Sequence, residues 1–207
     1  MTIEQIIYVI VASILSVLII CLWLYSPFKK LIYHFRYKSI YAKELYNIAL
    51  DNDYYLINNL TLKLDDELSI HVDHILFGDK YIYVVRDRYY NGLIAGIDRD
   101  KKFVLKKRKN QLLIDNPLIK NSLRVEKLAL ITHFKASLFI SLVVVNDNCL
   151  AKEITSTLDN SFIVGKSQIK KLIRRIESRE IETINEDQLR FAVKDIARIN
   201  ENNKIKN

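Results

Sequence analysis

Apolar and polar residues form blocks along the chain, and the central blocks predict a β-hairpin. Two apolar runs, at residues 72–77 and 81–85, flank a Gly-Asp-Lys turn at residues 78–80. Asp73 stands inside the first run, where a carboxylate has to be paired, hydrogen-bonded or used to hold a metal. The second run ends in a charged cluster of Arg86, Asp87 and Arg88. We expect this cluster to face Asp73.

The pattern on either side of the hairpin predicts further helices and strands. Apolar residues recur at helical spacing over residues 31–50 and again from Pro117 to about Phe134. The run at residues 137–145 is apolar almost throughout, which is typical of a strand covered on both faces of an α/β sheet. Short strands are predicted at residues 54–57, 103–105 and 162–164, helices at residues 168–176, capped by Ser167, and 185–199, and disorder at residues 201–207.

The N-terminal segment predicts a membrane anchor. Residues 6–25 contain no charge, and a run of about 20 such residues can cross the hydrocarbon core as a helix. A cleaved signal peptide needs a basic segment before the run and small residues after it, whereas Glu4 precedes this run and aromatic residues end it. Basic residues follow from Lys29 onward and none precedes the run. The positive-inside rule therefore predicts a single-pass protein of the cell membrane, with its N-terminus outside and its soluble domain in the cytoplasm.

This pattern divides the chain into an anchor at residues 1–28, an α/β domain at residues 29–180, and a C-terminal helix with a flexible tail at residues 181–207. The whole chain has a net charge of +8, and because Glu4 is the one charged residue of the anchor, the part after the anchor carries +9. This excess favours nucleic acid or an acidic lipid face as partner, with solubility as the alternative. Two basic clusters are candidates for phosphate contacts. They are Lys106, Lys107, Arg108 and Lys109, and Lys170, Lys171, Arg174 and Arg175. The alternatives are an edge charged against aggregation for the first and a solvated helix face for the second.

The order helix, hairpin, strand, helix, buried strand resembles the restriction-endonuclease-like α/β core, a mixed β-sheet flanked by helices. Val-Asp-His-Ile at residues 72–75 and Tyr-Asn-Gly at residues 90–92 resemble motifs of the nuclease-related domain, or NERD, family. Asn-Pro-Leu at residues 116–118, followed by Asn121, is similar to the family's Asn-Pro-Leu-x-x-Asn helix start. The resemblance covers residues 41–173, and an N-terminal anchor is common in that family.

The resemblance implies a nuclease centre, which this chain carries in altered form. In that fold a helix Glu, a strand Asp and a second-strand Glu-x-Lys hold Mg²⁺, which activates the attacking water, and the lysine stabilises transition-state charge. Glu44 and Asp73 match the first two positions. Arg86 and Arg88 stand at the Glu and Lys positions. Arg88 keeps a cation there, whereas Arg86 would repel Mg²⁺ and pair with Asp73 or Glu44.

Asp87 and two histidines are the remaining candidate ligands. Side chains alternate along a strand, so Asp87 should point away from Arg86 unless a bulge shifts the register. His71 shares a strand face with Asp73 and could line the site, whereas His74 should face away, and a structural role is favoured for both histidines. The two cysteines can build neither a disulfide nor a metal site. No phosphate-binding loop or dinucleotide motif is present, so we expect no small-molecule cofactor.

Three functional hypotheses follow. The first is a membrane-anchored NERD-like protein with a degenerate centre, held by a buried Asp73–Arg86 ion pair without metal, that binds nucleic acid or a protein partner. The second is an active Mg²⁺-dependent DNA or RNA phosphodiesterase that uses Glu44, Asp73 and a relocated Asp87, with Arg88 as the electrophile. The third is a structural membrane component that uses the fold for interactions. Arginine at a metal-ligand position favours the first.

Overall fold

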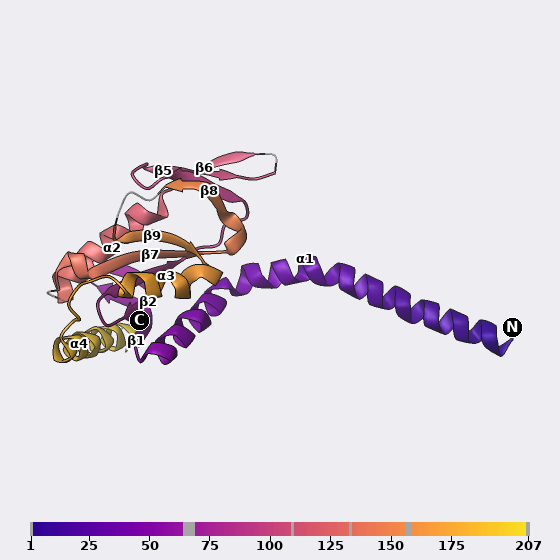
Figure 1. The fold of residues 1–207 in the computed structure, drawn as a ribbon, viewed down its shortest axis with the longest axis horizontal. Helices are drawn as coiled ribbons and strands as arrows, with labels where there is room; N and C mark the ends of the chain where they lie inside the picture. Colours follow the sequence, from indigo (N-terminus) through magenta and orange to yellow (C-terminus); the bar gives the residue numbers. More distant parts are fainter. Residues whose placement is uncertain (1, 64–68, 109, 133, 156–158, 206–207) are drawn as a thin grey trace. The chain divides into compact units, whose positions relative to one another are not determined.

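The computed structural model describes residues 2–63, 69–108, 110–132, 134–155 and 159–205 (Figure 1). The chain divides into two compact units, Met1–Tyr37 and Lys38–Asn207. Helix α1 (Ile3–Asn52) contributes its first part to the first unit and its last part to the second. It includes the helix predicted at residues 31–50 and remains helical through Pro27.

The first unit contains an apolar helical segment. Residues Ile3–Cys21 have a mean hydropathy of 2.4, and none of this window is buried by other parts of the chain. By length and composition the segment can cross a membrane, although a signal sequence has the same two properties. The segment is therefore a candidate membrane span.

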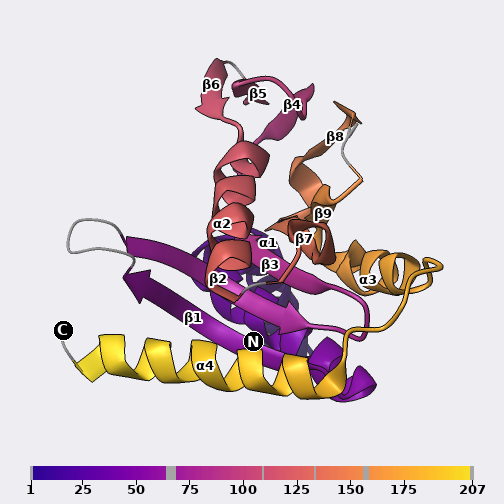
Figure 2. The ribbon, with the colours of Figure 1, turned by 90° about the vertical axis from the view of Figure 1, so that its left-hand side faces the viewer.

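The central sheet of the second unit has the strand order β1-β2-β3-β7-β9 (Figure 2). Its strands are β1 (Tyr55–Lys63), β2 (Ser69–Phe77), β3 (Ile82–Asp87), β7 (Phe139–Val145) and β9 (Ser161–Gly165). The first three strands are antiparallel, whereas β7 and β9 run parallel to β3. The predicted hairpin is thus present as β2 and β3. The predicted doubly covered strand is β7, in which all seven residues are buried.

Helices cover both faces of this sheet, as expected for a mixed α/β fold. Helix α2 (Pro117–Thr132) lies on one face, where Val125 and Leu128 join the core with Ile75 and Val84 of the hairpin (Figure 2). Helix α4 (Glu186–Ile205) packs along β1 and adds Leu189 to the same core. Helix α3 (Ile169–Glu177) and the last part of α1 cover the other face.

A second, smaller sheet has the order β6-β5-β4-β8. Its strands are β4 (Leu93–Ile97), β5 (Lys102–Lys106), β6 (Gln111–Asp115) and β8 (Leu150–Thr155). One face packs on the end of β7, where Ile94, Phe103 and Leu105 meet Val143 and Cys149. The sequence did not predict β6 or β8, because their short polar and apolar mixtures become strands only by pairing with β5 and β4.

Two local predictions at helix ends are wrong. Ser167 does not cap α3. It lies in the short helix η3 (Lys166–Gln168), and its hydroxyl donates to Asp147 Oδ1 at 2.9 Å. Helix α4 continues through Ile205, so residues 201–205 are helical where disorder was predicted, and residues 206–207 lie outside the described part of the chain.

Candidate functional site

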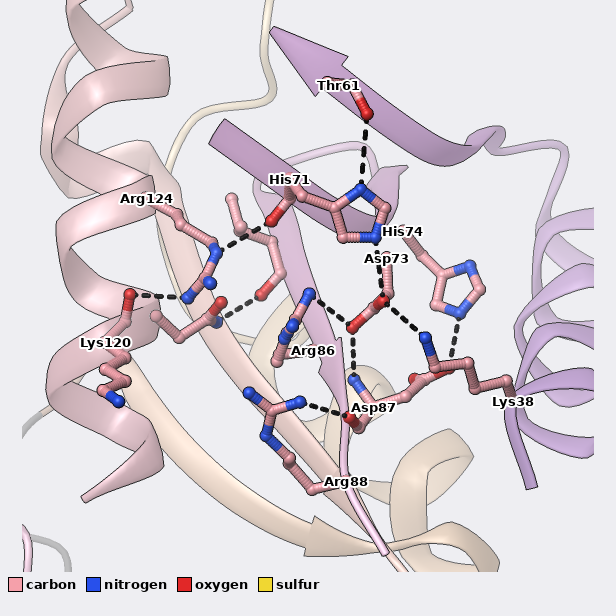
Figure 3. Close-up of polar contacts among 12 residues, drawn as sticks. Lys38, Thr61, His71, Asp73, His74, Arg86, Asp87, Arg88, Lys120 and Arg124 are labelled. Carbon is pink, nitrogen blue, oxygen red and sulfur yellow. Dashed lines mark hydrogen bonds and ion pairs between the residues drawn. The ribbon is translucent and has the colours of Figure 1, made fainter. Parts of the chain in front are cut away.

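Asp73 and Arg86 lie side by side on neighbouring strands (Figure 3). The backbone pairing of β2 with β3 runs as far as His74 and Val85, so both side chains stand just beyond its end. Arg86 Nη1 lies 3.0 Å from Asp73 Oδ2, and the two side chains are 14% and 5% exposed. Because both charges are largely desolvated, removing one partner would cost more free energy than the pair itself contributes.

The other carboxylate oxygen of Asp73 faces two further basic groups. His71 Nε2 lies 3.3 Å from Asp73 Oδ1, and Lys38 Nζ lies 3.8 Å from the same oxygen. Lys38 comes from α1, the helix that was expected to supply Glu44 as a metal ligand. The helix therefore contributes a cation at this point in place of an acid.

Two more guanidinium groups belong to this centre. Arg124 on α2 donates from Nε to the backbone oxygen of His71 at 2.9 Å. Burial lowers the pKa of Arg124, and the nearby positive charges of Arg86 and Arg88 lower that pKa further. We call the residues grouped around Asp73 the cation cluster. It consists of Lys38, Arg86, Arg88 and Arg124 (Figure 3).

Asp87 points away from Arg86 into a separate buried network. Its Oδ2 lies 2.9 Å from His74 Nε2, and His74 Nδ1 lies 2.6 Å from Asn58 Oδ1. Burial raises the pKa of the Asp87 carboxyl, and the hydrogen bond with His74 partly opposes that rise. The backbone N–H of Asp87 donates to Asp73 Oδ2 at 3.0 Å, which links the two carboxylates.

Glu44 and the two predicted basic clusters lie elsewhere. The Glu44 carboxylate pairs with Lys166 Nζ at 2.9 Å. Lys170 pairs with Asp51, while its neighbours Lys171, Arg174 and Arg175 are exposed on α3. Lys106, Lys107 and Arg108 lie at the connection of β5 to β6, and Lys109 lies outside the described residues. Among the ion pairs of the described residues, none joins either cluster to Asp73.

This arrangement does not fit a divalent metal. Mg²⁺ requires several oxygen ligands at short distance, but both Asp73 oxygens face basic groups and Glu44 is occupied by Lys166. Within the described part of the chain, no three His, Cys, Asp or Glu side chains are grouped so that they could hold a metal ion. The positive charge of Arg86 would also repel such an ion. The cluster is chemically suited to an anion.

Sequence reasoning missed Lys38 and Arg124 as members of the centre. Lys38 was noted only as a charge following the apolar run, because α1 was expected to contribute Glu44. Arg124 carried a usable signal, since it lies three residues after Asn121 and thus on the same side of α2. Asn121 Nδ2 donates to the backbone oxygen of Val84 at 2.8 Å, which directs this side of the helix toward β3.

Comparison with known proteins identifies the family. A search of curated proteins found no match. A crystal structure described as a protein of unknown function, AF1548, is similar over 79% of this chain and 96% of that chain, with 10% identity and a TM-score of 0.32. The family model of the nuclease-related domain, NERD, matches residues 38–146, more than half of the 207 residues, and this range contains the whole cation cluster. The chain therefore belongs to the nuclease-related domain (NERD) family.

Proposed function

We propose that this protein is a membrane-anchored NERD protein whose centre has lost metal-dependent cleavage and binds the phosphate groups of nucleic acid in the cytoplasm. The observation that carries the proposal is the Arg86 guanidinium, 3.0 Å from Asp73 at the position expected for a metal-ligating glutamate. A cation at this position removes affinity for Mg²⁺ and provides affinity for an anion.

The charges around Asp73 support an anionic ligand. The cation cluster has four formal positive charges, and Asp73 is paired with two of its members, Arg86 and Lys38. The Asp87 carboxylate contacts His74 and lies near Lys38, so positive charge still exceeds negative charge here. Lys38 is 61% exposed and His71 39% exposed, so a ligand can reach this side of the centre. Arg86 Nε is buried and makes no hydrogen bond within the described structure. A phosphodiester oxygen would satisfy such a donor and offset the positive excess.

The active phosphodiesterase is the weaker alternative. It would need the carboxylates of Glu44, Asp73 and Asp87 to converge on one metal. Each of these carboxylates instead has a basic partner of its own, on three different segments of the chain. Activity would require breaking these ion pairs and hydrogen bonds before a metal could bind.

The proposed anchor is the apolar segment Ile3–Cys21. Basic residues from Lys29 onward support an orientation with the N-terminus outside and the NERD domain in the cytoplasm. Extraction of membranes at alkaline pH should leave the chain in the membrane pellet, and digestion of intact cells by an external protease should spare the domain. Release of the chain by alkali would contradict anchoring.

Fluorescence anisotropy of labelled DNA and RNA with the detergent-solubilised full chain tests the binding. We expect binding without Mg²⁺, with a logarithm of the association constant that falls linearly with the logarithm of the salt concentration. In Arg88→Ala the slope of this line should be smaller in magnitude by about 1. Lys194→Ala is the matched control, because it removes one exposed charge from α4, outside the centre. Absence of binding at low salt would favour a protein partner. Mg²⁺-dependent cleavage that disappears in Asp73→Ala would establish the nuclease instead.

A further inference from the structure

The connection between β5 and β6 combines positive charge with exposed leucines, and the cation cluster does not account for it. Lys107 and Arg108 are exposed in the turn, which is closed by a hydrogen bond from Lys107 N to Asn110 O at 2.8 Å. Leu112 and Leu113 of β6 are 44% and 69% exposed. Together these residues form what we call the β5–β6 finger.

The two leucines lie on opposite faces of the edge strand. Leu112 pairs with Leu105 and Leu113 with Val104, and successive residues of a strand point to opposite sides. Strand β6 is at the end of its sheet, next to β5 alone (Figure 2). The finger therefore presents apolar side chains on both faces and basic side chains in its turn.

An exposed apolar edge strand needs a physical reason. Edge strands are normally protected by charges or proline within the strand, but β6 has three consecutive apolar residues and no charge before Asp115. Contacts with nucleic acid phosphates require cations and gain nothing from leucines. Leucines next to basic residues are suited to a bilayer surface, where the leucines enter the interface and the cations meet anionic headgroups.

We propose that the β5–β6 finger docks onto the surface of an anionic lipid bilayer. Charge complementarity commits the proposal to anionic lipid, because Lys107, Arg108 and half-buried Lys106 lie within a few residues of the exposed leucines. The anchor proposed above would hold the finger near such a surface and raise its effective concentration there.

The test measures how fast a cysteine in the finger reacts with a membrane-impermeant maleimide. The full chain carries Asn110→Cys with Cys21→Ser, since Cys149 is buried, and is reconstituted in discs of phosphatidylcholine with or without about 30% phosphatidylserine. We expect labelling to be roughly tenfold slower with phosphatidylserine, since docking hides the turn. Leu130→Cys on α2, at a position 75% exposed, is the matched reporter and should react equally in both discs.

Two further variants decide between occupants. Lys107→Glu with Arg108→Glu, and separately Leu112→Ser with Leu113→Ser, should each abolish the protection, and both alter only exposed side chains. Equal labelling rates of Asn110→Cys in the two kinds of disc would overturn the proposal. A second copy of the chain that covers the finger in both discs would give this result. Protection by added duplex DNA in discs without phosphatidylserine would assign the finger to nucleic acid and also overturn it.

Discussion

The two carboxylates of the central hairpin, Asp73 and Asp87, are both buried but have opposite surroundings. Asp73 is 5% exposed and faces the cations Arg86 and Lys38 as well as the His71 ring, so its charge is balanced by Arg86 and Lys38. Asp87 is 0% exposed, and burial raises the pKa of its carboxyl, while the hydrogen bond with the His74 imidazole partly opposes that rise. A buried carboxylate is tolerated either when a cation pairs with its charge or when a raised pKa favours its neutral form.

This difference shows how the two acids of the hairpin are each held by a partner from the chain itself. Strand alternation places Arg86 and Asp87 on opposite sides of β3, so each acid acquires a separate partner. The hydrogen bond from Asp87 N to Asp73 Oδ2 connects the two environments, at 3.0 Å. Because the partners differ, a change on either side should be felt mainly through its own partner, with this hydrogen bond as the direct link between the two carboxylates.

The largest expected effect comes from Asp73→Asn. The substitution keeps the shape but leaves Arg86 buried without a counter-charge, and breaking such a pair costs about 3 to 5 kcal/mol. Urea unfolding of the detergent-solubilised full chain measures the loss. Asp115→Asn is the control, because Asp115 forms an exposed ion pair with Lys120 and should change stability little. A small loss in Asp73→Asn would mean that the pair is effectively solvated.

Arg86→Glu should make stability depend on Mg²⁺. Two acids at the end of the hairpin would repel each other, and a bound cation would relieve the repulsion. The expected gain is about 2.7 kcal/mol when Mg²⁺ is at a hundred times its Kd. Thermal unfolding with and without Mg²⁺ measures it, with Arg86→Met as a control that should not respond. Stabilisation of the wild type by Mg²⁺ would contradict a degenerate centre.

His74→Leu tests the Asp87 side of the comparison. It removes the hydrogen-bonding partner of a fully buried carboxyl, which should cost about 1 to 3 kcal/mol in the free energy of unfolding. His74→Gln retains a polar side chain that can donate to Asp87 and should recover part of the loss. Equal losses in both variants would show that packing, and not the hydrogen bond, is what His74 supplies.

The hairpin and the pairing of Asp73 with Arg86 could be reasoned from the sequence because they depend on local order. Two apolar runs around a glycine turn predict the strands, and alternation separates Arg86 from Asp87. The same reasoning placed His71 beside Asp73, where its ring lies in the structure.

The remaining parts of the centre depend on contacts between distant segments. Glu44 is occupied by Lys166, more than a hundred residues later, and no local pattern indicates that pairing. Arg124 comes from α2, which follows strands β4, β5 and β6 in the chain. Strands β6 and β8 also depend on pairing with other strands. For that reason the sequence pattern did not show that the leucines of the β5–β6 finger lie exposed on an edge strand.

The smallest expected effect is a pH dependence that separates the two kinds of acid. The folded-state pKa of Asp87 is raised above its ordinary value of 3.8, mainly by burial, with His74, Asp73 and Lys38 as the neighbouring charged or titratable groups. Its contribution to stability is therefore fully present below pH 3.8 and is lost as pH rises through the raised pKa. Relative to the wild type, Asp87→Asn should become more stable as pH rises from about 4 to 7.

Asp115→Asn provides a control of opposite sign for this measurement. Lys120 lowers the pKa of Asp115, so the contribution of that acid is present above pH 3.8 and is lost as pH falls through the lowered pKa. Unfolding free energies are measured for both variants and the wild type over one pH series that extends below pH 3.8. As pH rises, Asp115→Asn should lose stability relative to the wild type below pH 3.8, and Asp87→Asn should gain stability above it. A pH-independent difference between Asp87→Asn and the wild type would mean that His74 keeps Asp87 fully ionised. Both carboxylates of the hairpin would then be balanced by positive charge, and the contrast between them would not hold.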